Sequence, residues 1–557
     1  MKPSAAPAVQ YSTRATREVA AFLDSVAVVG DRSVSEAVAN APGVALPATL
    51  DKLLGVLSDR DSTRLLDSIG AGITHYRSEH GVAPTADVVE AAIQQAKSAL
   101  HGIDAHGNVM DSVAGTSATS STSAPTSLQP NRAVVAILSA IAEAIPFASY
   151  LPVDISSNES KLAILSHTAA SDYGDYGQGA IMDGVNVGGV YASAQRMVRF
   201  ELGGNAPFTS KFTAVNLADD RGFCDPAQTG VPVLRGRTTV FVNGIPVARD
   251  TASGSTSTSA ISGGFNLKGV DHAMVGVVTP ATGEISITGI NPPLPAGSAL
   301  TAEGIVDYET APALIPVMQV LAQTYTLYAN PWRIMTRLGI DSNTQLRNEL
   351  GLDADSEALI AIRNQMAMER HYNALRKVEA LGGNNRVAYN FDFSGQIAQK
   401  TRSQIWQDFA SVIANADQQM AEDTMDHGIT HLYAPSFIAA QMQSLPSELF
   451  RPSGIAARPG IYRVGRLYDK YEVYYAPFGP TQSDDLKTAK VLAVGRSSQA
   501  GRNPIVLGDA VAPTFLPLAT NSDLAKQSAM YARDYTEVNP HQPSALGCAV
   551  IDVANLN

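Results

Sequence analysis

The chain has 557 residues, with 40 basic and 52 acidic side chains and a net charge of −12. This length predicts several domains and a large core, and the acidic balance argues against tight binding of nucleic acid. Only two cysteines occur, Cys224 and Cys548, which excludes a disulfide scaffold and a cysteine-rich metal site. Such cysteine usage is typical of a reducing cytoplasm. The sequence shows no signal peptide and no run of about 18 apolar residues, so we expect neither secretion by that route nor membrane insertion.

The first 110 residues are predicted to form a helical domain. Apolar residues recur at helical spacing, with plausible caps, in the segments 12–29, 47–57, 62–76 and 84–100. Residues 111–130 are rich in Ser and Thr and carry little apolar surface, which indicates a linker. A further apolar helix is expected over 132–148.

Residues 150–310 predict an antiparallel β excursion that is longer than a minimal hairpin. Short runs of β-formers alternate there with Gly, Asn, Asp and Pro. The predicted strands lie at 189–195, 196–202, 208–217, 237–248, 272–280 and 283–290. Asn243-Gly244 is a strong signal for a two-residue turn between strands. A second Ser/Thr-rich tract, Thr251 to Ser262, is predicted to be an exposed loop.

Two long helices are predicted after this region. Residues 325–328 favour a strand that stops at Asn330-Pro331, and a short helix is expected over 342–350. A long helix then runs without Gly or Pro from Ser356 to Leu381 and spans roughly 39 Å. A second helix is predicted over 403–427.

The second helix has one apolar face, which we expect to pack on a sheet. Its members are Ile405, Phe409, Val412, Ile413, Ala416 and Met420. Basic side chains mark the first long helix, and they form either a solvated face, with an Arg376–Glu379 pair, or contacts with neighbouring subunits. They are Arg363, Arg370, Arg376 and Lys377. Further strands are predicted at 429–435, 461–477, 488–495, 511–519, 528–540 and 545–556, with a helix over 435–445.

Several of these segments together resemble a known family. They are a strand followed by GLDADSEALIAI and a long mixed-charge helix, THLYAP after the second helix, and MYARDYTEVNPHQPSALGCAVIDV near the end. Their order resembles the major capsid proteins of tailed bacteriophages (Caudovirales), which have the Hong Kong 97-type fold, and in particular the T-even-like branch. The resemblance covers about residues 131–557. The helical domain 1–110 and the long β excursion depart from the minimal fold.

The resemblance implies an α+β fold with named parts. It places an N-terminal arm at 131–160 and an E-loop region with a β-rich insertion at 161–330. A peripheral domain with the spine helix follows at 331–428, then an axial domain at 429–510. Returning strands of the peripheral domain are expected at 511–557.

The function implied by the resemblance is structural and not enzymatic. Hexamers and pentamers of the chain would form an icosahedral shell that encloses double-stranded DNA and contacts it non-specifically. The implied partners are further copies of the chain and portal, scaffold and decoration proteins. The implied location is the virion, after assembly in the host cytoplasm. Two alternatives stay open: an encapsulin-like shell, and an enzyme or carbohydrate-binding surface protein whose 150–310 region binds a ligand.

Motifs for catalysis and metal binding are weak. The sequence contains no GxxxxGK[ST], GxSxG or HExxH motif. His427 and His431 have i, i+4 spacing, but Gly428 ends the helix between them. We therefore favour two histidines with local partners over a metal site.

Carboxylates also give no clear site. Asp172, Asp175 and Asp183 lie among glycines without the spacing of an EF-hand loop, which favours a solvated turn region. The pairs Asp484-Asp485 and Glu422-Asp423 are assigned to the surface. We predict no catalytic, cofactor-binding or metal-binding residue, and no cofactor.

Overall fold

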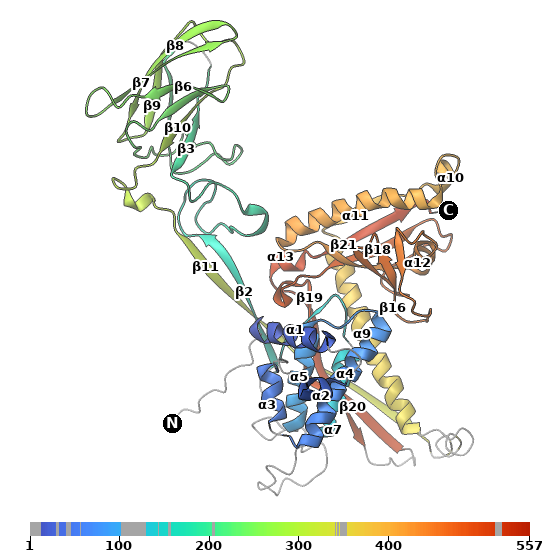
Figure 1. Cartoon of the computed structure of the whole chain (residues 1–557). Helices are drawn as coiled ribbons and strands as arrows, with labels where there is room; N and C mark the ends of the chain where they lie inside the picture. Colours follow the sequence, from blue (N-terminus) through green and yellow to red (C-terminus); the bar gives the residue numbers. More distant parts are fainter. Residues whose placement is uncertain are drawn as a thin grey trace, which may run out of the picture. The chain divides into compact units, whose positions relative to one another are not determined.

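The computed structural model describes residues 13–28, 33–40, 46–55, 57–101, 130–142, 144–153, 158–202, 206–339, 354–517 and 526–556, together with positions 341 and 345. They divide into two compact units: unit 1 comprises Met1–Ile164 and Thr324–Asn557, and unit 2 comprises Leu165–Gln323. Helices and mainly antiparallel sheets make up an α+β fold (Figure 1).

Unit 1 begins with a bundle of helices. They are α1 (Thr13–Val28), α2 (Val34–Asn40), α3 (Ala48–Leu54), α4 (Asp59–His80), α5 (Ala86–His101) and α7 (Pro130–Ala142). The Ser58 side chain caps α4, and Gly81 ends it with a φ of 68°, a conformation that glycine adopts without strain. The helices predicted here are confirmed, and α2 was not predicted. The expected linker at 111–130 falls almost wholly outside the described residues.

The bundle shares one apolar core with the rest of unit 1. Ile69 of α4, Ile93 of α5 and Ile141 of α7 are buried in the same cluster as Leu375 and Leu507. The two latter residues belong to α9 (Ala354–Gly382) and β19 (Ile505–Pro517). The N-terminal helices are therefore held by contacts with segments far along the chain.

A four-stranded sheet has the order β1-β19-β20-β12. Its other strands are β1 (Ser149–Tyr150), β20 (Lys526–Val538) and β12 (Asn330–Leu338). The strand predicted at 325–328 is the end of β11 (Met318–Tyr328), which stops before Asn330 as expected. A separate strand, β12, begins at Asn330 and pairs with β20, which the sequence did not predict. β12 is the edge strand, where proline costs no ladder hydrogen bond if its nitrogen faces outward. The short helix predicted over 342–350 lies almost wholly outside the described residues.

A seven-stranded sheet forms the other layer of unit 1. In sheet order its strands are β13 (Arg386–Asn390), β21 (Cys548–Ala554), β18 (Ala489–Gly495), β14 (Ile429–Ala434), β17 (Tyr471–Tyr475), β16 (Tyr462–Leu467) and β15 (Phe450–Pro452). Helix α12 (Ser436–Gln443) packs against β15, β16 and β17. The short helices α10 (Phe393–Gln396) and α13 (Gln542–Ala545) lie in connections. The sheet pairs strands that lie far apart in the sequence, such as β13 and β21.

Helix α11 (Arg402–Thr424) packs on this sheet with the predicted face. A capping box between Thr401 and Gln404 starts the helix. Phe409 and Ile413 are fully buried, and Trp406, beside that face, is buried as well. Contacts run from α11 to β13, β14 and β21. The expected packing on a sheet is confirmed, although most strands of that sheet follow Ile429.

Unit 2 is built around an eight-stranded antiparallel sheet. In sheet order its strands are β3 (Gln195–Arg199), β10 (Leu300–Ile305), β5 (Thr239–Val242), β6 (Ile245–Asp250), β7 (Ser259–Leu267), β8 (Val270–Thr279), β9 (Glu284–Asn291) and β4 (Phe208–Lys211). The β excursion is thus confirmed. So is the turn at Asn243-Gly244, where φ is 52° and 79°.

Three expectations in unit 2 were wrong in part. The strand predicted at 208–217 ends at Lys211. Of the strand predicted at 189–195, only Gln195 is in a strand, because the Val190 N–H donates to the Asp175 carboxylate and not to a ladder. The exposed loop predicted over 251–262 ends at residue 258. Ser259 begins β7 and is fully buried, with its hydroxyl donating to Asp250.

A two-stranded ribbon contains residues of both units. It pairs β2 (Glu159–Ala169) with β11 (Met318–Tyr328). Each strand therefore begins in one unit's range and ends in the other's.

Candidate assembly surfaces

Helix α9 packs against both sheets of unit 1 through a stripe of buried side chains. Met366, Ala374, Leu375 and Val378 are buried, and the helix contacts β18, β19, β20 and β21. The interior contains no glycine or proline, so nothing interrupts its backbone hydrogen bonds. The predicted long helix is confirmed with slightly wider bounds.

The Arg370 side chain of α9 forms ion pairs with other residues of the same chain. Its side chain is 5% exposed, and its Nη2 lies 2.6 Å from Oδ1 of Asp509, while Nε lies 3.5 Å from Oδ2 of Asp534. Burial lowers the pKa of the guanidinium, but the two carboxylates outweigh it, so the pKa rises. Burial also raises the pKa of Asp534 to about 6 against the opposing effect of Arg370. Both predictions for Arg370, a solvated face and a subunit contact, are therefore wrong.

The other basic residues of α9 divide between the interior and the surface. Lys377 Nζ lies 2.7 Å from Oε2 of Glu537, and Glu379 accepts from Lys490 at 2.5 Å. Glu379 therefore bonds to β18 and is not paired with Arg376 as predicted. Arg363 is partly exposed, and Arg376 is exposed and stays available to a solvated face or a neighbouring subunit.

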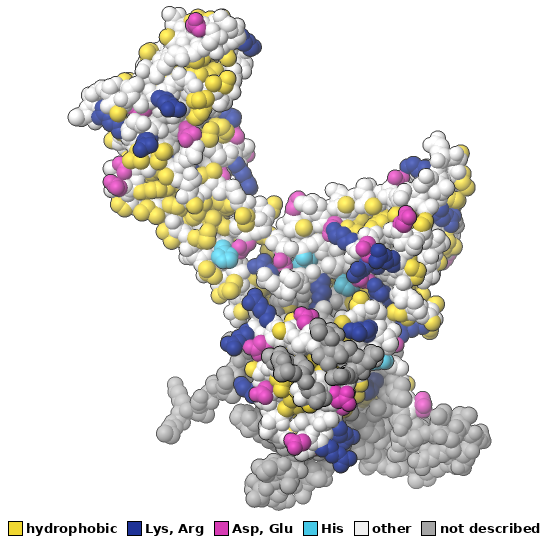
Figure 2. All heavy atoms as spheres, viewed as in Figure 1, with side chains coloured by type: hydrophobic (Ala, Val, Ile, Leu, Met, Phe, Trp, Pro, Cys, Tyr) yellow, Lys and Arg dark blue, Asp and Glu magenta, His cyan; other side chains and the backbone are white. Residues whose placement is uncertain are grey.

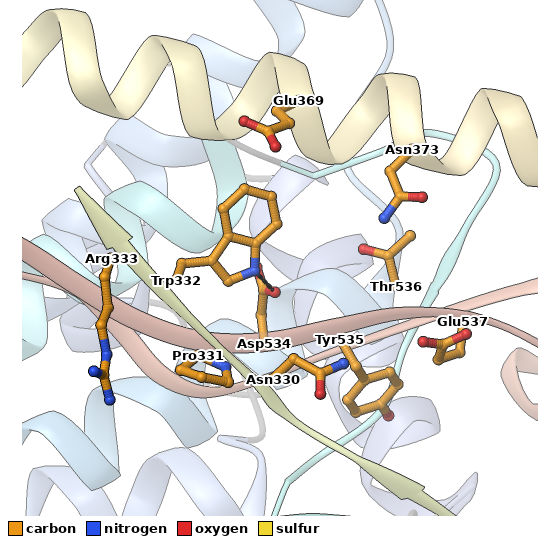
Figure 3. Close-up of a pocket in the computed structure, with 10 residues that line it drawn as sticks. All are labelled: Asn330, Pro331, Trp332, Arg333, Glu369, Asn373, Asp534, Tyr535, Thr536 and Glu537. Carbon is orange, nitrogen blue, oxygen red and sulfur yellow. Dashed lines mark hydrogen bonds between the residues drawn. The ribbon is translucent and has the colours of Figure 1, made fainter.

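A groove of about 360 Å³ lies between α9 and the strands β12 and β20. Figure 3 shows Glu369 of α9 over the Trp332 indole, and Asn373 facing Thr536 of β20. The Trp332 indole N–H donates to Asp534, which ties the floor of the groove to the Arg370 cluster. Neighbouring residues on a strand point to opposite faces, so Arg333 lies on the far face of β12, over the Tyr531 ring.

Unit 2 exposes a patch of large apolar side chains at the ribbon, which we call the ribbon patch. Its members are Leu165, Ile315, Val317, Met318, Val320 and Leu321, each between 41% and 62% exposed. Figure 2 shows hydrophobic side chains gathered on this part of unit 2. Along β11, Met318 and Val320 point to one face of the ribbon and Leu321 to the other. Exposed apolar surface of this kind marks an interaction site.

The two histidines considered for metal binding have local partners. His431 is only partly exposed, burial lowers its pKa to about 3, and its Nδ1 lies 2.8 Å from the Thr430 hydroxyl. Burial also lowers the pKa of His427, whose Nδ1 lies 3.2 Å from the Gly428 carbonyl oxygen. Within the described part of the chain, no group of three His, Cys, Asp or Glu side chains is placed to hold a metal ion.

The aspartates of the glycine-rich segment organise loops and do not converge. Asp172 accepts from the Gln178 N–H, and Asp183 accepts from the His167 N–H. Asp175 is half-buried and accepts from Val190, Asn216 and Gly222, which differs from the predicted solvated turn.

The paired carboxylates lie at the surface, as expected. Glu422 and Asp423 accept from glutamines one turn earlier on α11, and Asp485 accepts from the Ser483 hydroxyl.

Among the described helices, none is long and apolar enough to cross a bilayer.

Sequence reasoning missed the groove and the ribbon patch. Trp332 belongs to a predicted strand end, and nothing near it in sequence marks Glu369, Thr536 or Asp534 as its neighbours. The ribbon patch contains VMQVL, an apolar run that is equally typical of a buried strand. Only the pairing of β11 with a single strand shows that these side chains are exposed.

Comparison with known proteins gives structural matches alone. No protein-family model matches the sequence, and no curated protein matches it. The solved structures that resemble it are mainly capsid proteins of tailed phages. The capsid of the jumbo bacteriophage PhiKZ matches at 11% identity over 73% of this chain and 91% of that chain, with a TM-score of 0.36.

Two further solved structures match a smaller share of this chain. The capsid of Myoviridae phage XM1 matches at 10% identity over 58% of this chain and 90% of that chain, with a TM-score of 0.27. The SrpI encapsulin of Synechococcus elongatus matches at 9% identity over 43% and 79% of the two chains, with a TM-score of 0.29. At such low identities and TM-scores, the inference of function rests on the residues of this chain.

Proposed function

We propose that this chain is the major capsid protein of a tailed double-stranded DNA bacteriophage, with a Hong Kong 97-type fold of the T-even-like branch. Hexamers and pentamers of the chain form an icosahedral shell around the genome. Support comes from the sequence resemblance over about 131–557 and from the long helix α9, which lies between two sheets and is followed by a second long helix. The ribbon patch is the observation that carries the proposal.

A two-stranded ribbon is marginal in water by itself, and this one exposes apolar side chains along β11. Covering the exposed half of one such side chain contributes about 1 kcal/mol. A second copy of the chain covers the patch in each subunit of the shell. Because the same contact repeats around the shell, many modest contacts sum to a stable particle.

The remaining parts take the roles that the resemblance implies. Segment 131–160 is the arm, 161–330 is the E-loop region with its β-rich insertion, and 429–510 is the axial domain. With a net charge of −12, the chain contacts packaged DNA non-specifically and weakly. Portal, scaffold and decoration proteins complete the virion, which assembles in the host cytoplasm.

Sedimentation velocity and negative-stain electron microscopy of the purified chain, expressed with and without a scaffold, test this proposal. Closed shells, tubes or capsomers support it, and a monomer under all assembly conditions overturns it. Nuclease-protected DNA in particles made during infection supports the phage capsid. Shells that enclose only a protein cargo would instead identify an encapsulin-like compartment.

A further inference from the structure

The groove beneath Glu369 contains one carboxylate that has no cationic partner within the described residues. Of the acidic side chains that line it, Asp534 pairs with Arg370 and Glu537 pairs with Lys377. Glu369 is exposed and has no hydrogen-bond or ion-pair partner among the residues that the structure describes. A cation that enters the groove would therefore give the Glu369 carboxylate the partner that it lacks.

Two neighbours of Glu369 also lack partners. The Thr536 side chain is 6% exposed, yet its hydroxyl has no hydrogen-bond partner. It points into the groove toward Asn373 (Figure 3). An unpaired buried hydroxyl is unfavourable, and a polar group that enters the groove can give it a partner. Asn373 likewise has no hydrogen-bonded partner among the described residues, and it offers both a donor and an acceptor.

The Trp332 indole forms the floor and selects the kind of cation. An aromatic face attracts a cation within about 6 Å, and tryptophan attracts it most strongly. Guanidinium is flat, stacks on indole and has several N–H donors, so it can meet the Glu369 carboxylate and the Thr536 hydroxyl together. Ammonium is smaller and more strongly hydrated, and it matches this geometry less well.

We infer that the groove between α9, β12 and β20 binds an arginine side chain of a second copy of this chain. This inference rests on the proposed self-assembly for the identity of the partner. Charge complementarity supports the choice: Arg235 and Arg237 of unit 2 are exposed and have no ion-pair partner within the described ranges. They are examples of arginines that a neighbouring copy can present.

Tryptophan fluorescence tests the groove on the unassembled full-length subunit. The chain has two tryptophans, and Trp406 is fully buried, so an added solute reports on Trp332. N-acetyl-arginine methylamide should change the emission saturably, and the lysine analogue should bind more weakly. Glu369→Gln should weaken the arginine affinity about tenfold, a difference of about 1.4 kcal/mol. Glu357→Gln, exposed on the same helix, should bind like wild type.

A second measurement addresses the partner. In assembled particles, acrylamide should quench Trp332 less than in free subunits, and Glu369→Gln particles should regain part of that quenching. No saturable change in the free subunit, or equal binding by Glu369→Gln, overturns the arginine site even if shells form. Saturable binding without reduced quenching in particles overturns the second copy as partner. A chain that never assembles refutes the proposed function, while the titration still decides the chemistry of the groove.

Discussion

Arg370 Nη2 lies 2.6 Å from Asp509 Oδ1 in the interior of unit 1, and the two side chains are only 5% and 10% exposed. The pair joins helix α9 to β19. Removing one partner of a buried ion pair leaves the other charge without compensation.

Arg370→Met should therefore lower the free energy of unfolding by about 3–5 kcal/mol. Urea denaturation of the unassembled subunit, followed by circular dichroism, measures the loss. Arg376→Met is the matched control, since Arg376 is exposed on the same helix and its loss should change stability by no more than about 0.5 kcal/mol. Equal effects of the two substitutions would show that the ion pair does not hold α9 in place.

Ile413→Asp should give insoluble or unassembled protein. Ile413 is fully buried, so the change loses about 1.5–3 kcal/mol of burial and leaves a carboxylate to desolvate. Asn415→Ser, at an exposed position on the same helix, is the control. Gln418→Glu is a poorer control than its exposure suggests, because Gln418 donates to Glu422 at 2.8 Å. Similar soluble yields of the Ile413 and Asn415 variants would mean that α11 is not packed on the sheet.

Ile413 and Arg370 show what the sequence can predict. Ile413 belongs to an unbroken helical repeat, so its burial follows from local spacing alone. Arg370 has no such local signal, because its acidic partners lie on β19 and β20, far along the chain. The same holds for β12: Pro331 looks like a strand end until the structure shows that it lies in an edge strand. The groove needs three separate segments to meet, and no pattern within one segment records that meeting.

Acid should destabilise unit 1 through buried histidines. Burial lowers the pKa of His80 to about 4 and the pKa values of His371 and His431 to about 3. Unfolded histidine titrates near about 6.5, so below that pH the unfolded chain takes up protons first and stability falls toward pH 3–4. Asp534 opposes this, since its raised pKa adds stability as pH falls from about 6 to about 4. The stability lost through the three histidines should exceed the stability gained through the one carboxyl group.

The melting temperature, followed by circular dichroism, should therefore be lower at pH 5 than at pH 7.5. His371→Leu should reduce the difference between the melting temperatures at pH 5 and pH 7.5, whether or not it changes the melting temperature at pH 7.5. His75→Gln, at an exposed position on α4, should change the difference little. A melting temperature that does not fall on acidification would contradict the role of the buried histidines.

A cut in the Ser/Thr-rich tract 111–130 should not release the N-terminal helices. Ile93 of α5 is buried in the core shared with α9, and the Asp87 carboxylate lies 2.8 Å from Arg496 Nη2. After cleavage at an inserted protease site, the two pieces should elute together in size-exclusion chromatography and separate on a denaturing gel. The isolated 1–110 fragment should lose helix content, in contrast to the independent domain expected from sequence.

Asp87→Asn should weaken this association, because the Arg496 guanidinium then lacks its buried carboxylate partner. The exposed Asp59 offers a matched control, Asp59→Asn. Separate elution of the wild-type pieces would show that the helices do form an autonomous domain.

Val320→Lys should leave a folded, soluble subunit that fails to assemble. Val320 is 62% exposed, so lysine costs the monomer little, but a shell contact would bury its charge. Gln319→Lys, on the neighbouring exposed position of β11, introduces the same charge next to Val320 and should impair assembly less. Sedimentation velocity gives the assembled fraction of each variant.

The most direct measurement is a cryo-electron microscopy reconstruction of particles purified from cells that express the full chain. The predicted result is a closed shell in which an adjacent copy covers Met318 and Val320, which share one face of β11, in each ribbon patch. Particles in which the ribbon patch faces solvent, or a preparation that contains only monomers, would contradict the account.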